Sequence, residues 1–325
     1  MSSNRLSKSI PYLILIGLSF LFPFLFQEKK FCLHLFIIIM LNIIFALGVR
    51  LTLLMGLPTL GHAAFALIGA YTSALLVMEV HISFWLALPL AGLAAVIIGV
   101  PVCYPALMRL RGGYFLLVTL AFVEFLVLLC TLPSWAGVFG GFEGIMRIPA
   151  PNSLPGLSAI KFSSKLSYSY IVLIITLLVA LFMYRIDNSQ FRRLIDATRQ
   201  SDILTECIGI SVARIKVITF IIVCFSGGIG GSLFAHYQHH ICPADFGIWP
   251  SIYMLLYVVF GGMGTIFGPI IGALILTIVP EILRFAPMME AIIFGSLLIV
   301  VALVLPHGLL SLRYQILSFF KSVIK

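Results

Sequence analysis

Two ionisable side chains stand inside long apolar runs and are the first candidates for chemistry. His62 lies in "LPTLGHAAFALIGAYTSALL" and Glu124 in "LVTLAFVEFLVLLC". If these runs lie in a bilayer, a charge at mid-depth costs about 2.5–3.5 kcal/mol on insertion scales, so such groups tend to face cavities or neighbouring helices. Two roles therefore stay open for each: a group on a polar pathway, or a hydrogen-bonded contact between helices.

Other arrangements of reactive residues do not form a recognisable site. His236, His239, His240 and Cys242 are close in sequence but lack Asp or Glu at metal-ligand spacing. The Gly-x-Gly at 262–264 lacks a dinucleotide fingerprint, and the chain has no GxxxxGK[ST] phosphate-binding loop. The six cysteines fit no disulfide or zinc framework. We predict no catalytic residue, no metal and no cofactor.

The composition identifies the elements that must position these residues. The 325 residues are 62% hydrophobic and only 10% charged, whereas a soluble domain has about 25% charged residues. The chain is therefore an integral membrane protein, in contact with membrane lipid. Its net charge of +9 comes from scattered Lys and Arg residues rather than a basic, aromatic-interleaved patch, which argues against nucleic-acid binding.

The apolar runs predict an all-α, polytopic membrane protein that forms one domain over residues 1–325. A helix needs about 20 apolar residues to cross a bilayer, and scanning gives ten candidate spans. They are Ile10–Phe26, Phe31–Leu54, Leu60–Met78, Phe84–Leu107, Tyr114–Leu132, Tyr168–Tyr184, Ile215–Tyr237, Trp249–Gly262, Thr265–Phe285 and Met289–Leu305. The eighth is short, so 249–285 reads either as two crossings or as one broken helix.

The distribution of Lys and Arg between loops predicts the orientation. Cytoplasmic loops are enriched in these residues, and the bias favours both termini in the cytoplasm. Residues 185–214 then form a cytoplasmic loop, and the Gly- and Pro-rich residues 133–167 form a loop on the outer side.

Small residues recur at helical spacing in several spans. Without bulky side chains, backbones approach closely, which is how helices associate in lipid. We expect tight helix packing, or the lining of a pathway, at Gly61, Gly227, Gly231, Gly264, Gly268 and Gly272. The last three would form one bare stripe if they were helical.

The cytoplasmic loop contains signals for a short, capped helix. Ser201 is a candidate N-cap, Asp202 suits the first turn, and Gly209 is a candidate stop. The helix between them carries apolar Leu204 and Ile208, which a solvated linker would not need. We expect it to dock onto a soluble partner.

Several segments occur in the order seen in LivM-type permeases, the membrane subunits of ABC importers for branched-chain amino acids. They include "LGHAAFALIGAYTSALL", "LMRLRGGYFLLVTLAFVE", "GGFEGI", "ATRQSDILTECIGISVARIKVITFII", "GGIGGSLFAHY", "VVFGGMGTIFGPIIGALIL" and "LPHGLL". The chain resembles this family from about Leu41 to Leu312.

The resemblance implies a multi-pass protein of the bacterial inner membrane. It implies as partners a second, homologous permease subunit, two cytosolic ATPase subunits and a periplasmic or lipid-anchored substrate-binding protein. Glu206, Cys207, Ile208 and Gly209 fall where such permeases carry the Glu-Ala-Leu-Gly that docks onto the ATPase, with Cys207 in place of Ala. ATP hydrolysis would then belong to the partners, and the chain itself would not be an enzyme.

Three alternatives remain beside an importer of branched-chain or other small amino acids. Related permeases carry urea or amides, although the retained segment from Thr119 to Glu124 favours amino acids. A proton-coupled secondary carrier would use Glu124 and His62. An intramembrane enzyme would need paired catalytic groups at matched depth, and only scattered single groups are found.

Overall fold

The structure is a computed structural model that describes residues 19–110, 112–151, 164–283 and 295–296. Residues 19–25 are helical. The elements that follow are α2 (Lys30–Leu54), α3 (His62–Met78), α4 (Phe84–Arg109), α5 (Gly113–Thr131), η1 (Pro133–Trp135), α6 (Ala136–Phe139), β1 (Ile145–Met146), α7 (Lys165–Asp187), α8 (Gln190–Gln200), α9 (Asp202–Cys207), α10 (Val212–Gln238), β2 (His240–Ile241), η2 (Pro243–Phe246), α11 (Ile248–Gly261) and α12 (Phe267–Leu283). Within the residues that the structure describes, the regular secondary structure is helical except for the short antiparallel pair β1–β2.

The predicted spans between residues 31 and 285 each coincide with a helix. Six described segments are long and apolar enough to cross a membrane, namely α2, α4, α5, α7, α10 and Pro243–Gly261. Two apolar helices, α3 and α12, are shorter. Most of the first predicted span and nearly all of the tenth lie outside the described residues, so the count of ten is not confirmed.

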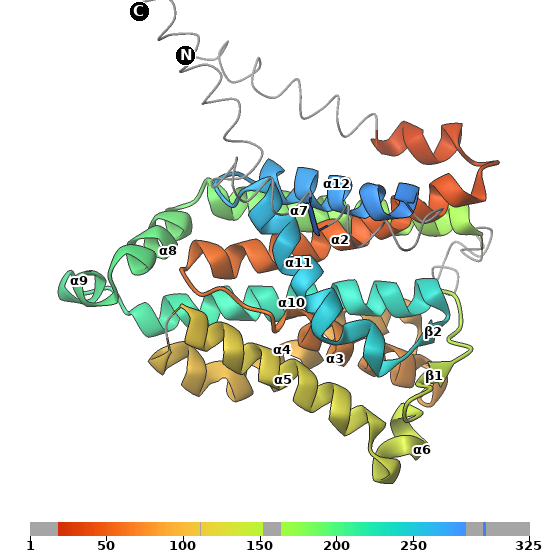
Figure 1. The fold of residues 1–325 in the computed structure, drawn as a ribbon, viewed down its shortest axis with the longest axis horizontal. Coiled ribbons are helices and arrows are strands. Elements are labelled where there is room, and N and C mark those ends of the chain that lie inside the picture. The colour runs from red at the N-terminus through yellow and green to blue at the C-terminus, as the bar shows by residue number, and fades with distance from the viewer. Residues whose placement is uncertain (1–18, 111, 152–163, 284–294, 297–325) are drawn as a thin grey trace, which may run out of the picture.

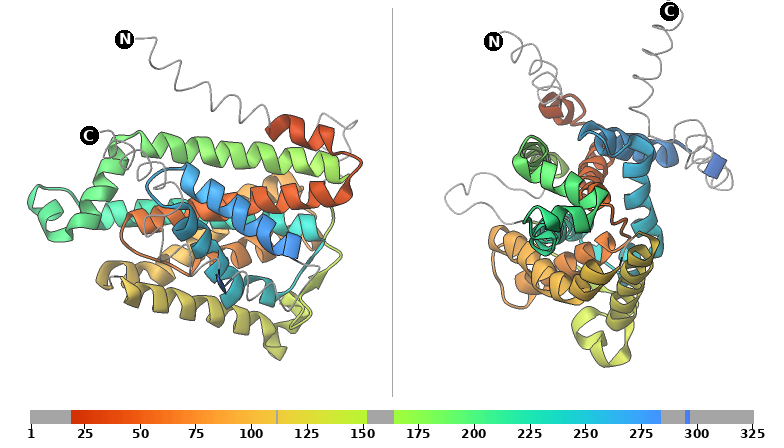
Figure 2. Two further views of the ribbon diagram at one scale, coloured as in Figure 1. Left: turned by 45° about the horizontal axis from the view of Figure 1, so that its top comes forward. Right: turned by 90° about the vertical axis from the view of Figure 1, so that its left-hand side faces the viewer.

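Helix α10 occupies the centre of the bundle. It packs most extensively against α3 and α4 and also lies along α2, while α7 and α12 pack on α2. Several of these helices run roughly along the long axis of the molecule (Figure 1). By contrast, α11 crosses one side of the bundle and links the region of α12 to that of α5, as the end-on view shows (Figure 2).

The central helices touch backbone to backbone at glycines. A Cβ at Gly69 of α3 would lie 2.2 Å from the carbonyl oxygen of Gly228, and one at Gly231 would lie 1.9 Å from that of Ala66. Any larger side chain would therefore force α3 and α10 apart. Small residues allow this approach where lipid gives no hydrophobic drive for helix association.

The described part of the segment at 249–285, which ends at residue 283, forms two helices packed on each other rather than one broken helix. Its chain turns between Gly261 and Phe267, and a Cβ at Gly268 would lie 1.8 Å from the carbonyl oxygen of Gly262. A Cβ at Gly272 would lie 1.9 Å from that of Tyr257. Glycine again permits the contact.

The two ends of the bundle carry different structures. Helices α8 and α9 project beyond the helix ends on the left of Figure 1, while α6, β1 and β2 lie at the right. At the right-hand end, three imidazoles bond to carbonyl oxygens of the chain before α7. The pairs are His236 with Pro149 at 2.8 Å, His239 with Ile148 at 2.9 Å and His240 with Glu143 at 2.8 Å.

The loop of residues 185–214 contains two helices where the sequence predicted one. Helix α8 precedes α9, and Ser189 caps it by accepting a hydrogen bond from the Phe191 backbone N–H at 3.1 Å. Its Ile195 is fully buried. Helix α8 therefore packs against the bundle, whereas α9 stands at the tip (Figure 1).

Candidate coupling surface and helix-crossing sites

Helix α9 begins and ends at the residues that the sequence indicated. The hydroxyl oxygen of Ser201 accepts a hydrogen bond from the Leu204 backbone N–H at 3.3 Å. After the helix, Gly209 adopts φ +80°. Its N–H donates to the Glu206 carbonyl at 2.9 Å, and the Ile210 N–H donates to the Thr205 carbonyl at 3.3 Å. This pattern is a Schellman stop.

The outward face of α9 is apolar and uncovered. Ile203, Leu204 and Ile208 are 68%, 69% and 70% exposed, and Glu206 and Cys207 are exposed beside them. Clustered apolar side chains at the tip of a projecting element are typical of a contact surface. We call these five residues the α9 surface.

An ion pair ties α9 to the central helix. Lys216 Nζ of α10 lies 2.9 Å from Asp202 Oδ2, and the two side chains are 5% and 18% exposed. The sequence indicated a helix-dipole role for Asp202 but not this partner. The pair fixes the base of α9 to the helix that packs most on α3 and α4.

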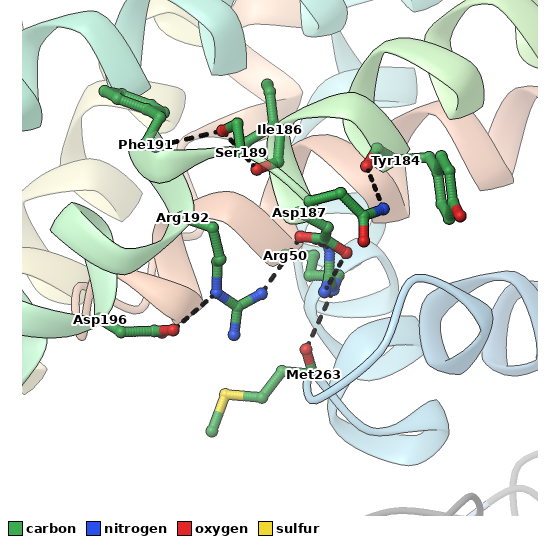
Figure 3. Close-up of polar contacts among 10 residues, drawn as sticks. Arg50, Tyr184, Ile186, Asp187, Ser189, Phe191, Arg192, Asp196 and Met263 are labelled. Atoms are coloured by element: carbon green, nitrogen blue, oxygen red, sulfur yellow. Dashed lines mark hydrogen bonds and ion pairs between the residues drawn. The ribbon is translucent and has the colours of Figure 1, made fainter. Parts of the chain in front are cut away.

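A second charged cluster, centred on Arg50, escaped the sequence analysis. Arg50 is 1% exposed. Its Nη1 and Nη2 donate to Asp187 Oδ1 and Oδ2 at 3.1 and 2.8 Å, and its Nε donates to the Met263 carbonyl at 3.0 Å (Figure 3). Arg192 also reaches Asp187 at 3.1 Å and Asp196 at 2.9 Å. The cluster joins α2, the end of α7, α8 and the α11–α12 turn.

His62 lies where α2, α3 and α10 meet. It is 1% exposed, and neither ring nitrogen has a hydrogen-bond partner among the residues that the structure describes. Phe45 and Phe65 approach the imidazole edge-on, with ring centroids 5.9 and 6.2 Å away, and a Cβ at Gly48 would lie 2.4 Å from its Cε1. Apolar rings and bare backbone lie against the imidazole, and both roles considered from sequence stay predictions.

Glu124 lies at a different junction. It is half-buried on α5, and its Oε1 would be 3.8 Å from a Cβ placed on Gly247, the residue before α11. The carboxylate thus faces the positive end of the α11 backbone dipole. His62 and Glu124 belong to separate helix contacts, and the structure does not unite them as one site.

The predicted glycines have unequal environments. Gly227, Gly231, Gly268 and Gly272 each leave no room for a Cβ, whereas a Cβ at Gly264 would meet nothing within 4 Å. Gly264 precedes α12 and is exposed, so the expected stripe of three is wrong. Gly61 precedes α3 and lies against Thr119, because a Cβ placed on Gly61 would be 3.1 Å from the Cβ of Thr119.

Residues 31–302 match the protein family described as branched-chain amino acid transport system / permease component. The chain belongs to this family. As the match covers most of α2 to α12, the helices, the glycine contacts and the α9 surface all fall within the permease family region.

Two curated relatives are similar to this chain to the same extent. The high-affinity branched-chain amino acid transport system permease proteins LivM of Salmonella typhimurium and Escherichia coli are each 33% identical to this chain over 291 residues. In both cases the alignment covers 83% of this chain and 68% of the relative. No solved structure matches the chain significantly.

Proposed function

We propose that the chain is the membrane-spanning permease subunit of an ATP-binding-cassette importer that moves branched-chain amino acids into the cytoplasm. The α9 surface is the observation that carries the proposal. It is a capped helix with exposed apolar side chains, held to the central helix by the Asp202–Lys216 pair. Family membership and the names of the LivM relatives support the solute class.

The proposed assembly contains four kinds of chain. Two cytosolic ATPase subunits bind the α9 surface and its equivalent on a second, homologous permease subunit. A periplasmic or lipid-anchored binding protein delivers the solute at the opposite end, where α6, β1 and β2 lie. In this arrangement both termini and residues 185–214 are cytoplasmic, and the protein resides in the bacterial inner membrane.

The contacts suggest how ATP-driven movement enters the bundle. A displacement of α9 reaches α10 through Lys216, and α10 carries it to α3 and α4 through extensive packing. The permease itself performs no hydrolysis. A proton-coupled carrier gains no support, since His62 and Glu124 lie at separate helix junctions.

The test is to reconstitute the chain with its partner subunits and replace one residue of the α9 surface. Leu204→Asp places a charge on a side chain that is 69% exposed, so the fold should persist while the ATPases no longer co-purify and leucine uptake is lost. Phe142→Asp, at a residue 82% exposed near the opposite end, is the matched control. Retention of the ATPases and of uptake by Leu204→Asp would contradict the proposal.

A further inference from the structure

A cavity of about 330 Å³ lies between α2, α10, η2 and α11. Ligand pockets span roughly 300–1,000 Å³, so this one suits a small solute. Much of its wall is apolar and includes Leu41, Phe234, Phe246 and Met254. Such a wall would accommodate an aliphatic side chain.

Polar groups from α2, η2 and α11 also line the cavity. Asp245 of η2 contributes a carboxylate, of which Oδ2 accepts a hydrogen bond from the Cys242 backbone N–H at 2.9 Å. Asn42 of α2 donates to Thr277 Oγ1 at 2.9 Å, which leaves its amide oxygen as an acceptor. A carboxylate and an amide oxygen in an apolar-lined space favour a solute that carries N–H donors, such as an ammonium group.

The start of α11 lies at the same end of the cavity as Asp245. Helix α11 begins at Ile248, two residues after the lining segment 244–246, and its Pro250 also lines the space. The backbone dipole places partial positive charge at this helix start, but the Glu124 carboxylate already lies opposite Gly247 there. Pro250 has no backbone N–H to donate, so the charge that the cavity offers a solute is the Asp245 carboxylate.

Phe45 separates the cavity from His62. Its side chain lines the cavity, and its ring lies edge-on to the imidazole at 5.9 Å. The ring packs on bare backbone, because a Cβ at Gly230 would lie 2.4 Å from Phe45 Cε1. Behind this ring, His62 is buried with both nitrogens unpartnered, and an unsatisfied buried polar group of this kind calls for an explanation.

We propose that the cavity is a transient subsite for the ammonium group and side chain of a branched aliphatic amino acid, with Phe45 as the gate between the subsite and His62. This rests on the proposed function. Asp245 and the amide oxygen of Asn42 receive the ammonium group, and the apolar wall receives the side chain. When the Phe45 ring swings away, the imidazole gains the passing solute or water as its hydrogen-bond partner.

The gate is tested with Phe45→Ala in the complete importer in proteoliposomes. The variant should pass radiolabelled leucine without ATP and without the binding protein, whereas the wild-type complex should not. Phe36→Ala is the matched control, since Phe36 is a buried aromatic residue on the same helix, 6% exposed and stacked on Phe22. Equal leucine leak in both variants, or none in either, would overturn the gate.

The subsite is tested by filling the cavity with Ile38→Trp, at a half-buried lining residue. Most leucine uptake should be lost while the ATPases and the binding protein remain bound. Ile97→Trp, at an outward-facing α4 residue that is 70% exposed, should keep its uptake. Equal uptake by the two variants would refute the subsite alone, whereas a wild-type complex that accumulates no leucine would refute the proposed function together with the subsite.

Discussion

Arg50 illustrates how a single charge can organise a membrane bundle. It is buried, and its guanidinium bonds a carboxylate in bidentate fashion and a backbone carbonyl besides. The planar fork of arginine suits this geometry, which lysine would not reproduce. One side chain thereby holds together segments that are 137 and 213 residues distant in sequence.

Replacing Arg50 should destabilise the protein strongly. Arg50→Ala leaves Asp187, 16% exposed, with Arg192 as its remaining partner and leaves the Met263 carbonyl without its donor, so we expect a loss of up to about 3–5 kcal/mol, the cost of a buried charge left unpaired. Thermal unfolding in detergent should show a clearly lowered Tm. Arg109→Ala, at an exposed arginine in the last turn of α4, should leave Tm almost unchanged; equal Tm values for the two variants would contradict a structural role for the cluster.

At the level of residues, the sequence identified unusual side chains but not their partners. His62 and Glu124 were conspicuous because they interrupt apolar runs. Arg50 interrupts the end of such a run as well, and this is the signal that could have singled it out. Its partner Asp187 lies 137 residues further along the chain, at the end of α7, and a pairing over such a distance depends on tertiary packing that one sequence does not reveal.

At the level of elements, the local sequence predicted α9 but not the neighbouring helix α8. Ser201 and Gly209 act within a few residues of themselves, so their cap and stop are readable from the sequence. Helix α8 was missed, although its Ser189 cap and the apolar spacing of Phe191, Leu194 and Ile195 are present. The abundance of charge in this segment made it resemble a loop.

The ion pair at the base of α9 should control the mobility of that helix. Lys216→Met removes the charge but keeps much of the aliphatic stem, so α9 loses its link to α10. Hydrogen–deuterium exchange of peptides covering residues 201–210 should become faster. Arg193→Met, at an exposed residue of α8, serves as the control, and unchanged exchange in Lys216→Met would show that other contacts hold α9 in place.

Hydropathy predicted where the helices lie in the sequence but not which helices pack on each other. The spans between residues 31 and 285 were predicted because each must be apolar throughout. Spacing alone did not predict which glycines bring two backbones together. A glycine permits such a contact only where another backbone lies opposite it, and none lies opposite Gly264 among the described residues. The turn before Phe267 removes Gly264 from the α12 stripe.

At the level of the whole molecule, α9 and the β1–β2 pair lie at opposite ends of the bundle (Figure 1). If the helices span a bilayer, these two ends face opposite compartments. The excess of Lys and Arg in residues 185–214 favours the cytoplasm for the α9 end.

Thiol labelling can determine this orientation. Cys207 is exposed, whereas Cys103, Cys130 and Cys224 are buried. A membrane-impermeant maleimide should label Cys207 in inside-out vesicles stripped of peripheral proteins, and not in right-side-out vesicles. Cys207→Ser controls for the remaining thiols, and an added Phe142→Cys should react from the other side. Labelling of Cys207 in right-side-out vesicles would reverse the proposed topology and remove the ATPase-docking role.

The glycine contact between α3 and α10 has a mechanical consequence. With the carbonyls of Ala66 and Gly228 set against bare Cα atoms of the other helix, neither helix can slide past the other without an atomic collision. Helices α3 and α10 must therefore move together as one rigid unit. Helices α11 and α12 form a second rigid unit, because their backbones meet at Gly268 and Gly272 in the same way. Backbone movements that open the protein are then rotations of the α3–α10 pair against the α11–α12 pair, with α2 and the Arg50 contacts between them.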